Sequence, residues 1–97
     1  PVSRFPAVRR DIALIVPEEE KTERITDIIE NTGGKLLIDS DLFDYFQDEA
    51  MQKGRKKSLA FHLIFQSSER TLIDKEVDAI MKKIVRALEE KGWMVRK

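Results

Sequence analysis

The chain has 97 residues, of which 41% are hydrophobic and 37% are charged, a composition that fits one globular domain with a modest core. Its 18 basic and 18 acidic side chains balance, which argues against a broad electrostatic grip on nucleic acid or on an anionic membrane. It has no cysteine for a disulfide framework or a thiolate metal site, and no apolar run approaches the ~20 residues of a membrane span. We therefore expect an intracellular domain without a metal site. Because the chain opens with Pro1, we interpret residues 1–97 as one domain excised from a longer protein.

The N-terminal third predicts a strand followed by a helix. Residues 10–17, RDIALIVP, alternate large apolar side chains with other residues, which is typical of a strand with one buried face. A helix should then begin with Thr22 as its cap and end at Gly33–Gly34. Its apolar stripe comprises Ile25, Ile28 and Ile29.

The remaining residues predict a hairpin, a second helix and a last strand. Residues 35–47 form the second strand, either continuous or bent around Asp39–Asp41, and residues 56–66 form the third, with a polar loop at 47–55. The second helix should be capped by Asp74 and close at Lys91–Gly92, before a short strand at 93–96. Its amphipathic stripe comprises Val77, Ile80, Met81, Ile84, Val85 and Leu88.

This order, β-α-β-β-α-β, predicts an α+β fold of the ferredoxin-like type. We expect an antiparallel four-stranded sheet with both helices on one face and an open opposite face, because no chain is left to cover the second face.

Strand alternation assigns side chains to the two faces. The bulky side chains of the third strand must meet the helices, and Phe43 and Tyr45 of the second strand are assigned to the same side. The open face then carries a sparse set: Asp11, Ala13, Asp44, Phe46, Ser58, Ala60 and His62. Small residues flanked by a carboxylate and an exposed aromatic ring favour a shallow platform for a flat ligand, although a hydrated face or a face packed on a neighbouring domain would show the same pattern.

Other function classes lack their signatures. No nucleophile, base and orienting group can be assembled around the lone His62, and no Gly-rich phosphate loop is present, so no catalytic residue is predicted. An RNA-recognition motif would place aromatic side chains where Ser58, Ala60 and His62 stand. A regulatory domain of the ACT type would be expected to have a Gly-rich turn after the first strand, and none is seen.

Four stretches in order resemble one known family: FPAVRRDIALIV (5–16), LFDYF (42–46), KSLAFHLIFQSSERTL (57–72) and DKEV (74–77). They are similar to the ferredoxin-fold anticodon-binding domain at the C-terminus of the bacterial phenylalanyl-tRNA synthetase beta subunit. The resemblance covers essentially the whole chain. It implies a module that binds the anticodon stem-loop of tRNA(Phe), with the first anticodon base, a guanine, on the open face.

The resemblance also implies site residues. The family contacts the base through the Asp of an LFDVY-like strand, the aromatic residue two positions later and the Ser of KSLAF, which correspond to Asp44, Phe46 and Ser58. Phe46 stands where the family usually has tyrosine. A bulge that shifted the strand would turn Tyr45 outward instead. Small residues such as Ala13 and Ala60 would let the base approach the sheet.

Basic side chains near these elements are candidates for phosphate contacts, and Arg9 and Arg10 beside the first strand are the best of them. The full set is Arg4, Arg9, Arg10, Arg55, Lys56, Lys57 and Arg96.

For the parent protein, the resemblance implies a cytoplasmic class II ligase that uses ATP and magnesium, with catalysis in an alpha subunit and an (αβ)2 tetramer. This domain alone would be neither an enzyme nor a cofactor or metal site, and it would have no membrane partner. The alternative from another class is a domain-packing element that contacts protein and no RNA.

Overall fold

The computed structural model describes residues 5–96. The strands are β1 (Val8–Pro17), β2 (Leu37–Phe46), β3 (Lys56–Phe65) and β4 (Met94–Arg96). The helices are α1 (Thr22–Gly33), the 3-10 turn η1 (Gly34–Leu36), α2 (Glu49–Lys53) and α3 (Asp74–Glu89). None of the helices in this part of the chain has the length and apolar character needed to cross a membrane.

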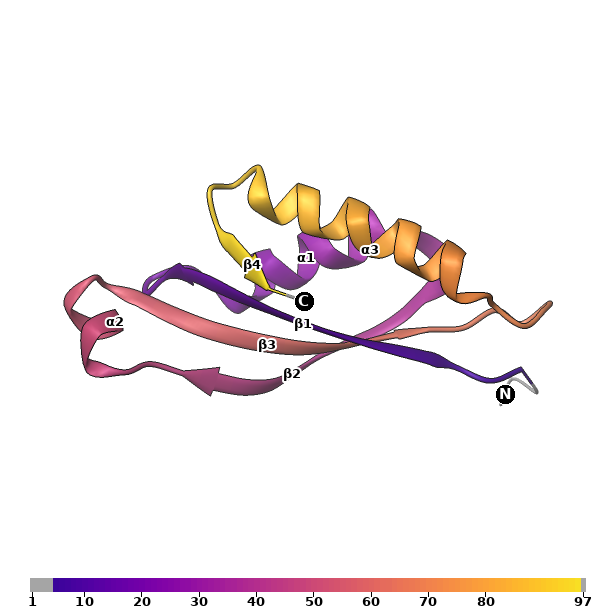
Figure 1. The fold of residues 1–97 in the computed structure, drawn as a ribbon, viewed down its shortest axis with the longest axis horizontal. Helices are drawn as coiled ribbons and strands as arrows, with labels where there is room; N and C mark the ends of the chain where they lie inside the picture. Colours follow the sequence, from indigo (N-terminus) through magenta and orange to yellow (C-terminus); the bar gives the residue numbers. More distant parts are fainter. Residues whose placement is uncertain (1–4, 97) are drawn as a thin grey trace.

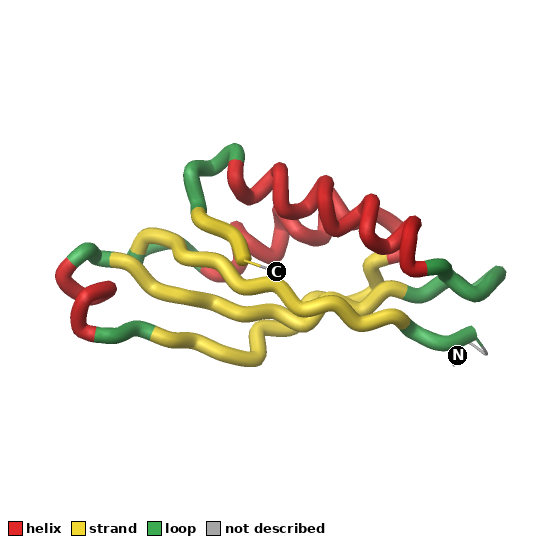
Figure 2. The backbone as a smooth tube through the Cα atoms, viewed as in Figure 1, coloured by secondary structure: helices red, strands yellow, loops and turns green. Residues whose placement is uncertain are grey.

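The four strands form one antiparallel sheet in the order β2-β3-β1-β4, which confirms the ferredoxin-like α+β fold. β1 pairs with β3 from Val8↔Phe65 to Pro17↔Lys56, whereas β4 pairs only with Ala13–Ile15. Figures 1 and 2 show α1 and α3 side by side on one face of the sheet, as expected. The molecule is elongated, with extents of 48 × 23 × 19 Å.

The core lies between the sheet and the two long helices. Alternation placed the β1 and β3 side chains correctly, and the helix stripes supply the opposite half of the core. The buried set is Ile12, Leu14, Val16, Ile25, Ile29, Leu37, Leu59, Phe61, Leu63, Phe65, Leu72, Val77, Met81, Ile84, Leu88 and Trp93. Of the predicted stripes, Ile28, Ile80 and Val85 are only partly buried and pack at the margin of this core.

The predicted loop at 47–55 contains a helix. The Asp48 carboxylate accepts a hydrogen bond from the Met51 N–H at 2.8 Å and caps α2, which lies at the tip of the β2–β3 hairpin, away from α1 and α3 (Figure 1). Five residues are too few to show helical periodicity, so the expectation of an irregular loop was wrong.

Both predicted helix caps were wrong by one residue. Thr22 and Asp74 are the first helical residues, and Lys21 and Ile73 occupy the cap positions. At α3 the Glu76 carboxylate accepts the Ile73 N–H at 2.9 Å and also binds the guanidinium of Arg70. The hydrogen bond from Arg70, followed by that from Ile73, lowers the pKa of Glu76. Residues 68–72 (SERTL) therefore help to fix the start of α3, because Arg70 holds the Glu76 carboxylate that accepts the Ile73 N–H.

The assignment of Phe43 to the helix-covered face was also wrong. β2 has register irregularities between Leu37 and Asp39 and between Leu42 and Asp44, so Phe43 is an extra residue in the ladder. Its ring stacks on His62, whose neighbours Phe61 and Leu63 are buried on the other face. The bulge shifts the pairing register by one residue, so that Leu42 stands opposite Phe61 before it and Asp44 stands opposite Ala60 after it.

Gly33 lies where the end of α1 meets the start of β2, and we expect Gly33→Ala to destabilise the fold. A Cβ at this position would stand 2.5 Å from Cδ2 and 2.8 Å from Cβ of the core residue Leu37. Moving Leu37 Cβ requires moving the strand. We expect a net loss of about 1–3 kcal/mol in the free energy of unfolding, despite the better helix propensity of alanine.

Urea denaturation of Gly33→Ala beside Gly54→Ala measures this effect. At Gly54 the nearest atom to an added Cβ is 3.7 Å away and φ is −84°, so that variant should be nearly neutral. A Gly33→Ala protein as stable as the parent would show that Leu37 and the start of β2 can move aside at little energetic cost.

Candidate functional site

The open face of the sheet is organised in rows that run across the strands. One row contains Phe46, Ser58, Ile15 and Met94, in the strand order β2, β3, β1, β4. The next row contains Asp44, Ala60, Ala13 and Arg96 in the same order. In a third row His62 stands opposite Asp11 and Asp41. The smallest side chains therefore lie in the middle of the face, between an acidic and a basic end.

Four of the residues expected from the resemblance are neighbours in these rows. Phe46 stands directly opposite Ser58, and Asp44 stands directly opposite Ala60. Phe46 is 54% exposed, while Ser58 and Ala60 are half-buried. The bulge at Phe43 leaves Phe46 on the open face, and Tyr45 pairs with buried Leu59 and so has the opposite orientation. Tyr45 is nevertheless 54% exposed, because the helices do not extend over this end of the hairpin (Figure 1).

A linked cluster fixes the next row. His62 Nδ1 lies 2.7 Å from Asp11 Oδ1, and Arg9 Nε lies 3.4 Å from the same oxygen. The rings of Phe43 and His62 are parallel within 2°, with their centroids 3.7 Å apart. The cluster joins β1, β3 and the bulge of β2. It holds the Phe43 ring at a defined place on the open face.

The two predicted phosphate contacts separate onto opposite faces. Arg9 lies on the open face beside Asp11. Arg10 has the same parity as buried Ile12, and its guanidinium lies 3.3 Å from Asp74 and 3.4 Å from Asp78 of α3. Arg10 is therefore not grouped with the other candidates. Arg4 lies outside the described residues.

A hollow of about 390 Å³ lies on the open face next to these residues. It is lined by Asp11, Ile12, Ala13, Phe43, Ala60 and Arg96, and we call it the alanine slot after the two methyl groups in its floor. Phe43 was not among the expected site residues, and Arg96 was named only in the wider set of basic candidates for phosphate contacts. Alternation could not place Phe43 because of the bulge, and the register of a three-residue strand such as β4 cannot be read from sequence.

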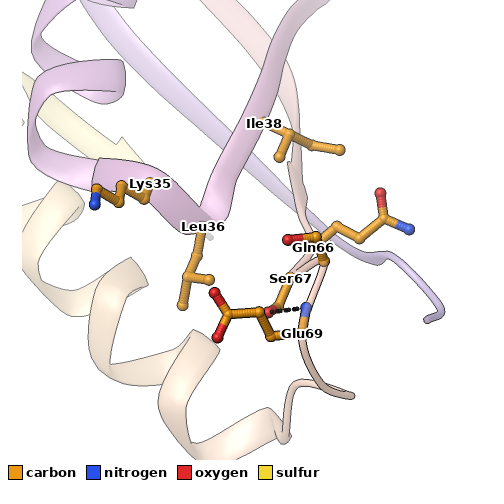
Figure 3. A pocket seen from close by; sticks show the side chains of 7 residues that line it. Lys35, Leu36, Ile38, Gln66, Ser67 and Glu69 are labelled. Carbon is orange, nitrogen blue, oxygen red and sulfur yellow. Dashed lines mark hydrogen bonds between the residues drawn. The ribbon is translucent and has the colours of Figure 1, made fainter. Parts of the chain in front are cut away.

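A second hollow, of about 450 Å³, lies near the junction of η1 with β2 and the segment after β3 (Figure 3). It is lined by Lys35, Leu36, Ile38, Gln66, Ser67, Ser68 and Glu69. Ser67 Oγ accepts the Glu69 N–H at 3.1 Å, which orders this segment locally (Figure 3). The lining mixes apolar, cationic and anionic groups without a common direction, so it does not indicate a particular ligand.

Comparison with known proteins agrees with the fold and with the sequence resemblance. Residues 3–96 match the model of the ferredoxin-fold anticodon binding domain. A phenylalanine–tRNA ligase beta subunit of Listeria monocytogenes is 44% identical over 91 residues, which is 94% of this chain and 11% of that protein.

Two further beta subunits of phenylalanine–tRNA ligase are similarly related. That of Halalkalibacterium halodurans is 45% identical over 89 residues, covering 92% of this chain and 11% of that protein. That of a Bacillus cereus strain is 42% identical over 97 residues, covering 99% and 12%. The chain thus spans about a ninth of the length of the relatives it matches.

Proposed function

Because this chain belongs to the family of ferredoxin-fold anticodon binding domains, we propose that it binds the anticodon stem-loop of tRNA(Phe) as a module of a phenylalanine–tRNA ligase beta subunit. The observation that carries the proposal is the cluster of Asp44, Phe46, Ser58 and Ala60 on the uncovered face. Arg9 lies on the same face, where it pairs with Asp11 but remains 60% exposed, so a phosphate could still reach its guanidinium.

The chemistry of the cluster suits a guanine as the first anticodon base. The Watson–Crick edge of guanine presents the N1–H and an N2 amino hydrogen side by side, and one carboxylate accepts both. Adenine cannot make this pair. The Phe46 ring offers a stacking surface of the kind that proteins use for splayed RNA bases, and the small side chain of Ala60 lets the base approach the sheet.

The remaining proposals concern the parent protein. Such a subunit would act with an alpha subunit in an (αβ)2 tetramer, in a cytoplasmic class II enzyme that uses ATP and magnesium. This domain would contribute tRNA positioning and no chemistry. With equal numbers of acids and bases, it should bind RNA weakly by itself, with a dissociation constant of ~10⁻⁴ M or above at physiological salt.

One observation supports a second role in packing against protein. β2 is an edge strand that exposes a series of large apolar side chains, namely Ile38, Leu42, Phe43, Tyr45 and Phe46. Exposed apolar patches commonly mark contact surfaces. Ile38, Leu42 and Tyr45 have no part in the proposed RNA surface, so a neighbouring domain is the natural partner for them.

Phe46→Ala in the full-length ligase should raise KM for tRNA(Phe) by about tenfold, because a base–aromatic stack contributes roughly 1–3 kcal/mol. The rate of phenylalanine activation should not change, since that step does not involve the anticodon. Thermal stability should fall little, because the ring is 54% exposed.

Tyr45→Ala is the matched control, because Tyr45 is equally exposed but has the opposite orientation. Aminoacylation kinetics and melting temperatures of both variants separate the two roles. If Tyr45→Ala raised KM and Phe46→Ala did not, the assignment of the stacking ring would be reversed.

A further inference from the structure

The strand β2 separates its charged and uncharged side chains onto the two faces of the sheet. Its three aspartates, Asp39, Asp41 and Asp44, all have the parity of the open face. On the helix side, the ladder positions beyond the start of the strand are the uncharged residues Ser40, Leu42 and Tyr45. In a chain of which 37% is charged, this stretch without charge marks the helix side of β2 as a distinct surface.

Leu42 and Tyr45 are exposed although they lie on the side of the sheet that carries the core. They stand opposite Phe61 and Leu59, which are buried, yet Leu42 is 39% and Tyr45 is 54% exposed. Exposed apolar surface with an aromatic ring and without charge is typical of the centre of a protein–protein interface. We propose that Leu42 and Tyr45 form a docking site for an amphipathic helix with a basic flank, supplied by the rest of the parent beta chain. This inference rests on the proposed function, which makes the chain a module of a longer beta subunit.

An acidic stripe on α1 borders this site. Ser40 Oγ donates a hydrogen bond to Glu30 Oε2 at 2.8 Å, so the Glu30 side of α1 faces β2. Glu23, Asp27 and Glu30 are exposed and lie four and three residues apart, so they share this side of the helix. Among residues 5–96 no basic side chain forms an ion pair with any of the three. The stripe therefore offers unpaired negative charge to a cationic partner.

The stripe and the apolar pair extend in the same direction from one contact. α1 and β2 run in opposite senses, because Glu30 touches Ser40 and, nearer the connecting turn, Gly33 lies against Leu37. From Ser40 the strand reaches Tyr45 over ~13 Å, and from Glu30 the helix reaches the far end of the stripe over ~10 Å. One helix laid along β2 would therefore meet the apolar pair and the acidic stripe together.

The irregular edge of β2 favours a helix over a strand as the partner. The ladder is interrupted between Leu37 and Asp39 and again between Leu42 and Asp44, and such bulges discourage the addition of a strand. A helix can instead lie on the uncovered side chains and extend the helical layer beside α1. The related beta subunits have ample chain to supply it, because the match covers only 11% or 12% of their length.

Thiol reactivity tests the site, because the chain has no cysteine of its own. Tyr45→Cys and Phe46→Cys replace side chains that are each 54% exposed, so iodoacetamide should modify both thiols at similar rates in the isolated 97-residue chain. In the full-length ligase the rate at position 45 should fall by about tenfold or more, because a packed thiol reacts only when the contact opens. The rate at position 46 should fall only when tRNA(Phe) is added. Mass spectrometry of the peptide that contains each position gives both rates.

Asp27→Lys in the Tyr45→Cys ligase tests the basic flank. Reversing one charge of the stripe should raise the rate at position 45 by about two- to fivefold, the factor that an exposed ion pair contributes. Glu89→Lys makes a comparable change at the last residue of α3 and should leave the rate as it is. An equal effect of the two reversals, or no effect of Asp27→Lys, would exclude a basic flank.

A benzophenone amino acid at position 42 of the full-length ligase identifies the partner. Irradiation should cross-link it to a peptide of the same beta chain that has apolar residues at helical spacing and lysine or arginine beside them. A cross-link to the alpha subunit or to tRNA(Phe) would overturn the assignment of the partner.

The outcomes separate this inference from the proposed function. A thiol at position 45 that reacts equally fast in the isolated chain and in the ligase would overturn the docking site. Protection of position 46 by tRNA(Phe) in the same experiment would leave the proposed function standing. Protection of position 45 by the ligase, with position 46 indifferent to tRNA(Phe), would overturn the proposed RNA surface and leave the docking site standing.

Discussion

Asp44→Asn in the full-length ligase should lower kcat/KM for tRNA(Phe) by about one to two orders of magnitude. The substitution keeps the size of the side chain but replaces one acceptor oxygen with a donor, which then faces the donors of the guanine edge. Leaving such a pair unmatched costs roughly 1–3 kcal/mol. The loss should shrink for a tRNA whose first anticodon base is adenine, because the contact to Asp44 is already absent.

A double comparison of both proteins with both tRNAs measures the coupling. Asp39→Asn removes the same charge from the same strand at an exposed position opposite Ile64, and serves as the control for general electrostatic effects. If the losses from Asp44→Asn and from the base change simply added, Asp44 would not read that base. The packing role would then be the better account of the open face.

Phe61→Ala should have the largest effect on stability, lowering the free energy of unfolding by about 3–5 kcal/mol. Phe61 is fully buried and lies at the centre of the sheet, opposite Ile12 on one side and Leu42 on the other. Removing its ring leaves a cavity that strands paired on both sides cannot collapse. A domain of this size has only ~5–15 kcal/mol of stability in total.

Phe46→Ala makes the same chemical change on the opposite face and should lower the free energy of unfolding far less. The two variants together show whether the covered face supports folding while the open face remains free for binding. Urea denaturation of both variants and of the parent protein gives the loss in the free energy of unfolding for each substitution. A loss below about 1 kcal/mol for Phe61→Ala would mean that the helices repack over the cavity.

The order of the elements was sufficient to predict the fold, and the alternation of β1 and β3 was sufficient to predict the covered face, because the two helices bury one face of these central strands. The same alternation places Arg10 on the covered face, because Arg10 has the parity of Ile12. Its charge alone, however, had grouped Arg10 with Arg9 as a candidate phosphate contact. The features that could not be predicted from the sequence depend on how the strands pair. The bulge at Phe43 is set by the partner strand and by the stack on His62, which lies far away in the chain.

The helix ends and α2 show a second limit of sequence reasoning. Thr22 and Asp74 are good capping residues, but at α3 the Glu76 carboxylate accepts the N–H of Ile73 and so fixes Ile73 as the cap. Local preference for a cap therefore did not decide where the helix starts. Alternation placed Asp44, Phe46, Ser58 and Ala60 on the open face, and the family resemblance singled them out as site residues. The position of Arg96 beside Ala13 depends on a register that only the folded sheet defines.

The strand order has a consequence for the route of folding. The Gln47–Lys56 contact spans 9 residues and belongs to a local hairpin, a class of structure that forms in about 1–10 μs. The Asp11–His62 contact spans 51 residues and requires closure of a long loop, which makes it intrinsically slower. The proposed guanine site therefore lies within the hairpin, whereas the alanine slot exists only once β1 has docked.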